Sequence, residues 1–382
     1  MLPALKVARP SANTNHRPCL RSGLLGVLLL LMLAAPALGG TPISGTPTAL
    51  QPLLGDSDSF AMEINNRGEV AGRSVGAVTT AVVWDRSGNP TMLMPLEGDF
   101  SALAEGINNR GEVAGVSRSG QGACPDVGFD TAVVWNRHGV PTALPPLPGD
   151  LESRAFAINE NGVVIGTSLG TRGVNVPTAC EAIFTPVKWD RNGNATKLPA
   201  LPGFLEGFAQ DLNNRGDVVG GSIDFSLFPF ITGTAWGANN VPAALSPPAG
   251  YFDTATNGNN NNGLVTGETF DLGLGGLPDR AVVWDRKGNA TTLPPLDGDP
   301  DSAGQAINNR GAVAGNSGFD LFGFFGLPTG TAVVWDKHGV PTALNPLAGE
   351  TDSFASGIND PGHVVGRSFN ADTGTNTAVV WR

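Results

Sequence analysis

The chain has 382 residues, of which 15% are charged, and its 34 Asp and Glu outnumber its 23 Lys and Arg to give a formal net charge of -11. Affinity for phosphate groups needs clustered cations, so this acidic composition excludes a nucleic-acid partner. The 53 glycines and 30 prolines leave little room for helices and favour many short strands joined by turns.

The first 39 residues have the pattern of a secretory signal peptide. Four basic residues come first, namely Lys6, Arg9, Arg17 and Arg21. An apolar run over 24–33 and small residues near Ala37 follow. The run is short of the roughly 20 apolar residues that a spanning helix needs, which makes a retained membrane anchor the weaker alternative. We therefore predict a signal peptide over 1–39 and a single domain over 40–382. We expect the domain to be exported, to the periplasm or the exterior, with no transmembrane segment after cleavage.

Copies of one unit fill the rest of the chain. Each copy contains a strand-like segment that ends in tryptophan, as in "TAVVW", and the seven tryptophans are Trp84, Trp135, Trp189, Trp236, Trp284, Trp335 and Trp381. A second marker, "INNRGEVAG" and its variants, occurs once in every copy. A repeat of about 43 to 54 residues is typical of propeller blades or of another repeat array.

Each copy divides into four predicted strands. In the first copy they are "SFAMEIN", "EVAGRS", "TTAVVW" and "PTML". Val and Thr between Gly, Asn and Pro are typical of strands, and turns such as Asn66-Arg67-Gly68 favour hairpins. We expect the first strand to be innermost, because small residues occupy one position in it where blades would crowd the axis. These residues are Ala61, Ala104, Ala155, Ala209, Gly304 and Ala355.

The two ends of the repeat region are complementary. Residues 46–50, "TPTAL", read as a fourth strand without a third, whereas 375–381 read as a third strand without a fourth. Pairing them would complete a seventh blade and protect the exposed sheet edges. A linear solenoid would not need ends that complete one unit. We therefore predict an all-β fold, a seven-bladed β-propeller of four-stranded antiparallel blades, closed by pairing of the N-terminal and C-terminal strands.

The repeated pattern Ala-x-x-Ile-Asn-x-x-Gly-x-Val-x-Gly-x-Ser, followed by the Trp strand, resembles the HAF-type extracellular repeat family over residues 46–382. The resemblance implies a secreted bacterial repeat protein and brings no settled activity. The family is named for a His-Ala-Phe stretch before the Trp, and this chain departs from it. Thr80-Ala81-Val82 and its equivalents stand there instead, so a role tied to that His is not implied.

Catalytic residues are hard to find in the repeated pattern. His138, His338 and His363 occupy turn or strand-start positions, and no nucleophile stands beside a base. Tyr251 is the sole tyrosine, and most arginines belong to the repeated turns. The tryptophans match the repeat one for one, which favours packing between blades over sugar stacking. We therefore predict that the protein is not an enzyme.

Acidic residues gather before each predicted first strand. They are Asp56, Asp58, Asp99, Asp150, Glu152, Glu206, Asp253, Asp299, Asp301, Glu350 and Asp352. In a closed ring they would surround the channel mouth and attract Ca²⁺ or a basic partner. The alternative is that these side chains shape the connections through hydrogen bonds to the backbone. Apart from Ca²⁺, we expect no cofactor.

Long apolar loops distinguish the fourth, fifth and sixth blades. Their phenylalanines are Phe225, Phe228, Phe230, Phe270, Phe319, Phe322, Phe324 and Phe325. One exposed patch of this kind would mark an interaction site, unless the loops fold over the blade edges. We therefore predict a secreted, non-enzymatic, monomeric binding or scaffold protein that docks an unidentified protein or surface ligand on this face.

Two alternatives come from other function classes. The first is a propeller hydrolase or lyase that uses ring carboxylates such as Asp99 and Glu152. The second is a purely structural cell-surface or matrix protein.

Cys124 and Cys180 lie in equivalent loops of adjacent predicted blades. Adjacent blades bring such loops together and an exported chain meets oxidising conditions, so we predict a disulfide between them. If unstrained, it would stabilise the fold by about 2 to 4 kcal/mol. A thiol titration of the native, unreduced protein is expected to find neither cysteine free, and two titrating thiols would contradict the pairing.

Overall fold

A computed structural model describes residues 45–120, 130–172, 181–224, 230–270, 277–318 and 330–382. The chain divides into two compact units, Met1–Thr41 and Pro42–Arg382, and only the second contains described residues. The predicted signal peptide therefore lies outside the described residues. Among the described residues, no helix is long and apolar enough to span a membrane.

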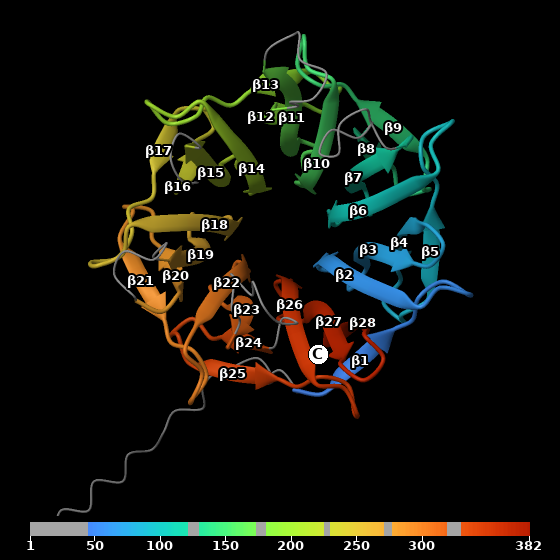
Figure 1. Ribbon diagram of the computed structural model, residues 1–382, viewed down its shortest axis with the longest axis vertical. Coiled ribbons are helices and arrows are strands. Elements are labelled where there is room, and N and C mark those ends of the chain that lie inside the picture. The colour runs from blue at the N-terminus through green and yellow to red at the C-terminus, as the bar shows by residue number, and fades with distance from the viewer. Residues whose placement is uncertain (1–44, 121–129, 173–180, 225–229, 271–276, 319–329) are drawn as a thin grey trace, which may run out of the picture. The chain divides into compact units, whose positions relative to one another are not determined.

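The second unit is a ring of seven four-stranded antiparallel sheets, each forming one blade (Figure 1). From the axis outwards, blade 1 consists of β2 (Asp58–Ile64), β3 (Val70–Val75), β4 (Thr79–Trp84) and β5 (Pro90–Leu93). Blade 2 consists of β6 (Ser101–Ile107), β7 (Val113–Arg118), β8 (Asp130–Trp135) and β9 (Pro141–Leu144). Blades 3 and 4 consist of β10 (Glu152–Ile158), β11 (Val164–Arg172), β12 (Glu181–Trp189) and β13 (Ala195–Lys197), and of β14 (Glu206–Leu212), β15 (Val218–Asp224), β16 (Phe230–Trp236) and β17 (Pro242–Ala244).

The remaining blades repeat this order, with one exception in the last. Blades 5 and 6 consist of β18 (Asp253–Asn259), β19 (Val265–Phe270), β20 (Arg280–Trp284) and β21 (Ala290–Leu293), and of β22 (Ser302–Ile307), β23 (Val313–Ser317), β24 (Thr331–Trp335) and β25 (Pro341–Leu344). Blade 7 consists of β26 (Asp352–Ile358), β27 (Val364–Asn370), β28 (Thr375–Trp381) and β1 (Pro47–Leu50).

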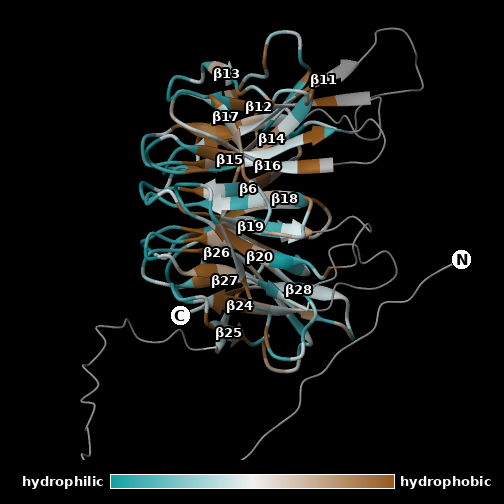
Figure 2. Ribbon diagram, turned by 90° about the vertical axis from the view of Figure 1, so that its left-hand side faces the viewer, coloured by the Kyte–Doolittle hydropathy of each residue, from teal (hydrophilic) through white to brown (hydrophobic). Residues whose placement is uncertain are grey.

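The predicted closure is confirmed. Strand β1 pairs antiparallel with β28, with Pro47 opposite Trp381 and Leu50 opposite Ala378. The two ends of the repeat region therefore share one sheet. The prediction that the first strand of each copy is innermost is also confirmed, and hydrophilic turns gather along one face of the ring (Figures 1 and 2).

The tryptophans pack between blades. All seven side chains are fully buried, and each lies at the end of the third strand of its blade. Each indole N–H donates to a backbone carbonyl that follows the outermost strand of the preceding blade, as from Trp135 to the carbonyl of Met94 at 2.6 Å. Burial of the ring and satisfaction of its one polar atom together explain why every copy keeps this residue.

A closed ring of asparagine side chains joins the seven blades near the axis. In each turn after the innermost strand, the first Asn donates its side-chain N–H to the backbone carbonyl of the equivalent Asn in the next blade. The donors are Asn65, Asn108, Asn159, Asn213, Asn260, Asn308 and Asn359, at 2.9 to 3.1 Å. The last of them returns to the carbonyl of Asn65, so the ring has no open end.

A second ring runs beside the first through the next residue of each turn. Its backbone N–H donates to a side-chain oxygen of the equivalent residue in the following blade, at 2.7 to 2.9 Å. The residues are Asn66, Asn109, Glu160, Asn214, Asn261, Asn309 and Asp360. The repeated Asn-Asn of the sequence therefore serves both its own turn and the contact between blades.

Replacing Asn108 by alanine is expected to lower the free energy of unfolding by about 2 to 4 kcal/mol. The change removes the bond to the carbonyl of Asn159 and the acceptor for the backbone N–H groups of Arg110 and Glu112, which are 3.0 Å away. Urea unfolding measures the difference. The control is Thr142→Ala on the exposed outer strand β9, which should change the value by less than about 0.5 kcal/mol. Equal stability of the two variants would contradict the structural role of the ring.

Candidate functional site

A cavity of about 540 Å³ lies on the axis of the ring, lined by the innermost strands and their turns. This volume is in the range of small-molecule binding sites. Its wall is mainly polar, because asparagine and glutamine side chains contribute from most blades. The fold therefore presents one central site to which several copies of the repeat contribute.

A β-bulge in every innermost strand shapes the cavity wall. In all seven blades the pairing with the second strand skips one residue, as between Ala61 and Glu63 or between Ala209 and Asp211. Bulges bend a strand and re-aim its side chains. The skipped residues all line the cavity and are Met62, Glu105, Phe156, Gln210, Asn257, Gln305 and Ser356.

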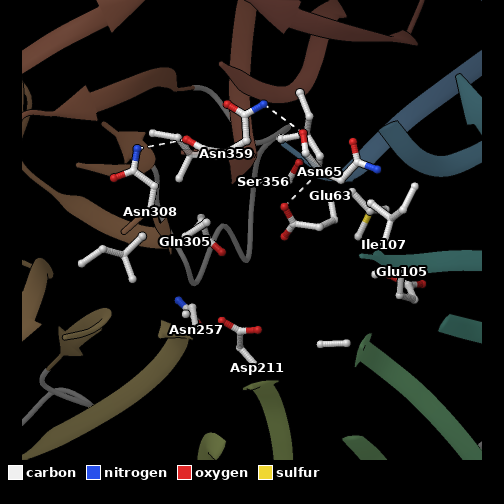
Figure 3. Close-up of a pocket in the computed structure, with 18 of the residues that line it drawn as sticks. Glu63, Asn65, Glu105, Ile107, Asp211, Asn257, Gln305, Asn308, Ser356 and Asn359 are labelled. Atoms are coloured by element: carbon white, nitrogen blue, oxygen red, sulfur yellow. Dashed lines mark hydrogen bonds between the residues drawn. The ribbon is translucent and has the colours of Figure 1, made fainter. Parts of the chain in front are cut away.

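The position after the skipped residue distinguishes two blades from the other five. In five blades it is small, namely Gly106, Ala157, Gly258, Ala306 and Gly357. In blades 1 and 4 it is Glu63 and Asp211, and both carboxylates line the cavity (Figure 3). A Cβ added to Gly357 would lie 3.0 Å from Oε1 of Glu63, so glycine there leaves space for this carboxylate.

Glu63 and Asp211 have strongly raised pKa values. Burial raises the pKa of Glu63 to about 8, and the nearby charge of Asp211 adds to the effect. The Oε1 atom of Glu63 accepts the backbone N–H of Ile64 at 2.8 Å. Burial also raises the pKa of Asp211 to about 6, against the opposing effect of hydrogen bonds from the backbone N–H groups of Leu212 and Asn259 at 2.7 and 2.8 Å. The two environments therefore separate the protonation of the two acids.

Other ionisable groups line the same cavity in blades 1, 2 and 7. Glu105 is a skipped residue of the bulge in β6, and burial raises its pKa. Its Oε1 is 4.0 Å from a guanidinium nitrogen of Arg73. Arg73 lies on β3 and Arg367 lies at the equivalent position of β27. The cavity therefore combines three acids of raised pKa with two cations.

Four of the acidic residues predicted to ring the channel mouth belong to a repeated backbone network. Asp56, Asp99, Asp150 and Asp299 accept the hydroxyl protons of serines in the second strands of their blades, at 2.5 to 2.8 Å. Each serine oxygen in turn accepts a backbone N–H of the connection between blades, such as that of Leu96 for Ser117. These carboxylates therefore shape the connections.

Most of the other predicted ring residues lie at contacts between blades. Asp58, Glu206, Asp301 and Asp352 accept backbone N–H groups at the start of the third strand of the preceding blade, at 2.8 to 3.3 Å. Glu350 accepts the hydroxyl proton of Thr377 at 3.4 Å, and Asp253 is buried. In the part of the chain that the structure describes, no three His, Cys, Asp or Glu lie close enough to hold a metal. The Ca²⁺ site stays a prediction.

Glu152 lies in an ionic cluster of blades 2 and 3. One of its carboxylate oxygens is 3.8 Å from a guanidinium nitrogen of Arg154, which also contacts Asp130 at 2.8 Å. Burial raises the pKa of Glu152 to about 7, helped by the charge of Asp130. None of these three residues lines the central cavity.

Most residues of the predicted docking surface and both loop cysteines lie outside the described residues. These are Phe225, Phe228, Phe319, Phe322, Phe324, Phe325, Cys124 and Cys180. Phe230 begins β16, but its side chain is also outside the described part. Phe270 ends β19 and is 3% exposed, so it is buried in its blade and contributes no exposed surface.

The repeat itself carries a signal for the cavity residues, and this signal lies in the innermost strands and not in the loops. Within an otherwise regular repeat, the two residues after the repeated small position change from copy to copy, as in Met62-Glu63, Glu105-Gly106 and Gln210-Asp211. The residue after the glycine of the second strand also changes, from Arg73 to Val116 to Arg367. Variation inside a strand core marks positions that packing between blades does not fix.

No family model matches the chain, and no curated protein does. Several solved structures share its fold. Virginiamycin B lyase from Staphylococcus aureus is 10% identical, with 88% of this chain and 99% of the lyase covered and a TM-score of 0.53. The β-propeller domain of the Trilobed protease from Pyrococcus furiosus is 12% identical, with 85% and 95% covered and a TM-score of 0.55.

A third similar structure is puromycin hydrolase, at 13% identity and a TM-score of 0.52. The match covers 88% of this chain and 56% of the hydrolase, so the chain spans just over half the length of that enzyme. At such identities these likenesses show the fold alone. No comparison bears on the resemblance to HAF-type repeats, which stays a prediction.

The prediction of a non-enzymatic binding or scaffold protein is contradicted by these comparisons, because the propellers of similar fold include a lyase and a hydrolase. They support the alternative of a propeller hydrolase or lyase better. The prediction considered catalytic residues only in the repeated turns and loops, whereas Glu63 and Asp211, two acids of raised pKa, line the central cavity. The fold leaves enzyme activity open.

Proposed function

We propose that the protein is an acid–base enzyme, a lyase or hydrolase, with its active site in the central cavity. Glu63 acts as the general acid and Asp211 as the general base. The observation that carries the proposal is this pair of carboxylates, with pKa values raised to about 8 and about 6, which line the same cavity from blades 1 and 4 at a position that is Gly or Ala in the other five blades. Pairs of acids whose environments separate their pKa values are the pattern of acid–base catalysis.

The two pKa values divide the roles between the acids. At pH 7 Glu63 is mainly protonated and can donate a proton to a leaving group, while Asp211 is mainly ionised and can accept one. The hydrogen bonds from Leu212 and Asn259 hold the Asp211 carboxylate in place. The amide side chains of Gln210 and Gln305 supply donors and acceptors for a polar substrate.

The similar structures support an enzyme without supplying its mechanism. Virginiamycin B lyase with one histidine replaced by alanine is catalytically inactive. No histidine lines the cavity of this chain among the described residues, and His138 and His338 occupy exposed turns. In this proposal the acid–base chemistry therefore belongs to carboxylates. If the predicted export is correct, the substrate is met outside the cytoplasm.

Glu63→Gln and Asp211→Asn are each expected to lower kcat by about 10² to 10⁴. The wild-type rate should follow a bell-shaped pH profile with limbs near pH 6 and pH 8, because activity needs Asp211 ionised and Glu63 protonated. The measurement is release of reducing ends from a panel of neutral and acidic soluble polysaccharides. Ultraviolet absorbance separates elimination, which leaves a conjugated double bond, from hydrolysis, which does not.

Glu97→Gln is the matched control, because Glu97 is exposed in the connection between blades 1 and 2 and does not line the cavity. It should keep the wild-type rate. Wild-type rates in the Glu63 and Asp211 variants, toward a substrate that the protein cleaves, would contradict the assignment.

Glu63→Gln is also expected to stabilise the protein at alkaline pH. The raised pKa means that the folded state holds the proton more tightly than the unfolded chain, so stability is lost as pH rises from about 4.5 to about 8. The Glu63→Gln variant has no carboxyl group to ionise at this position, so it does not lose this part of the stability. Its free energy of unfolding should match the wild type at pH 4.5 and exceed it by on the order of 2 kcal/mol at pH 8.5, allowing for screening by cavity water.

Urea unfolding at the two pH values tests this prediction. Glu97→Gln is again the control, and its free energy of unfolding should match that of the wild type at both pH values. A Glu63→Gln variant that is less stable than the wild type at pH 8.5 would show that the Glu63 carboxylate is not forced into an unfavourable environment.

A further inference from the structure

Two arginines of the adjacent blades 1 and 7 line the same cavity. Arg73 on β3 and Arg367 on β27 each follow the buried glycine of a second strand and line the cavity. Their guanidinium groups stack on phenylalanines of the innermost strands. The carbon Cζ of Arg73 is 4.9 Å from the centre of the Phe60 ring, and that of Arg367 is 4.6 Å from the centre of the Phe354 ring.

The positive charge of this pair is poorly compensated. Within the described part of the chain, Arg367 has no carboxylate within ion-pair distance, and Arg73 has only Glu105 at 4.0 Å. The Cζ of Arg367 is also 5.7 Å from the ring centre of Phe60, the ring on which Arg73 stacks. Burial, together with the charge of Arg73, lowers the pKa of Arg367. Two half-buried guanidinium groups that contact one aromatic ring favour an anion between or beside them.

We infer that Arg73 and Arg367 form a subsite for the carboxylate group of a sugar acid. Planar guanidinium groups bind carboxylates through paired, charge-assisted hydrogen bonds. The neutral amides of Gln210 and Gln305 suit the hydroxyl groups of the same ligand. The inference rests on the proposed acid–base function and adds the substrate class to it.

The subsite also favours elimination over hydrolysis. When the substrate carboxylate is neutralised by two guanidinium groups, negative charge that develops on the adjacent carbon is stabilised. Asp211 takes the proton from that carbon, and the electron pair of the C–H bond forms a double bond to the next carbon. The C–O bond there breaks, and its oxygen takes the proton of Glu63. The products are an unsaturated acid and an alcohol, and no further reactant is needed.

Ligand binding tests the subsite without any need for turnover. Nuclear magnetic resonance titrations of the protein with glucuronate and with glucose compare an acid with its neutral counterpart. The wild type should bind glucuronate at least about tenfold more tightly than glucose. Arg367→Gln should lose this preference, whereas Arg137→Gln, in the exposed turn of blade 2, should keep it. A wild type that binds both sugars equally, or neither, would overturn the proposal even if the variants failed to fold.

Glucose 6-phosphate distinguishes a carboxylate site from a general anion site. Preference for glucuronate supports the assignment. Binding of the phosphate with the same dependence on Arg367, and no binding of glucuronate, would overturn it in favour of a phosphate.

Turnover separates failure of the subsite from failure of the proposed function. The substrates are polygalacturonate, which carries the carboxylates that the subsite would bind, and its methyl ester, in which those carboxylates are masked. Cleavage of the acid form that Arg367→Gln reduces at least tenfold, with Arg137→Gln unaffected, supports both proposals. Glucuronate binding that depends on Arg367, with Asp211→Asn leaving any cleavage unchanged, keeps the subsite and overturns the catalytic roles. Cleavage of a neutral polysaccharide that depends on Asp211 but not on Arg367 keeps the catalytic roles and overturns the subsite.

Discussion

The two closed rings of hydrogen bonds around the axis are the constraint on which the rest of the structure depends. The first ring joins each turn to the next through a buried asparagine, and its last bond returns from Asn359 to Asn65. The side-chain oxygen of the same asparagine accepts backbone N–H groups of its own turn, as for Asn108 with Arg110 and Glu112. A buried amide is costly unless its donors and acceptors are paired, and here both are. One residue type therefore fixes the shape of the turn and the spacing of the blades together.

Fixed blades allow the cavity wall to carry groups that do not stabilise the fold. The asparagines of the first ring have both side-chain polar atoms paired, as Asn108 does. By contrast, burial acts against the charge on Glu63 and Asp211, and Arg367 has no described ionic partner. Such groups are expected where chemistry is done, because perturbed pKa values gather at functional sites. The hydrogen-bonded rings and packed blades stabilise the fold enough to hold Glu63, Asp211 and Arg367 in an environment that disfavours their charge.

The sequence predicted the scaffold well and the site poorly. The scaffold could be predicted because its signals repeat or complete a pattern. These signals are the seven tryptophans at regular intervals, the turns with Asn and Gly, and the complementary strands at 46–50 and 375–381.

The site depends on exceptions to the pattern. That Glu63 and Asp211 share one cavity follows only once the ring has closed and the bulges have turned both side chains inward. Their pKa values depend on burial in that cavity, which a single sequence does not show. The acidic residues before each strand were easier to see because they repeat, and most of those in the structure bind backbone or serine groups.

The bulge common to all seven innermost strands makes the axis a place where function can change without change of fold. In blades 1 to 6, two adjacent residues line the cavity: the residue skipped by the bulge and the residue after it. The strand pairing around the bulge is the same whether the residue after the skipped one is Gly106, Ala157 or Glu63. After duplication of a blade, a single substitution there can move an acid from one side of the cavity to another in steps of one blade. Descendants of one repeat array could in this way acquire different separations between acid and base, and so different reactions, while the outer strands and the tryptophans stay unaltered.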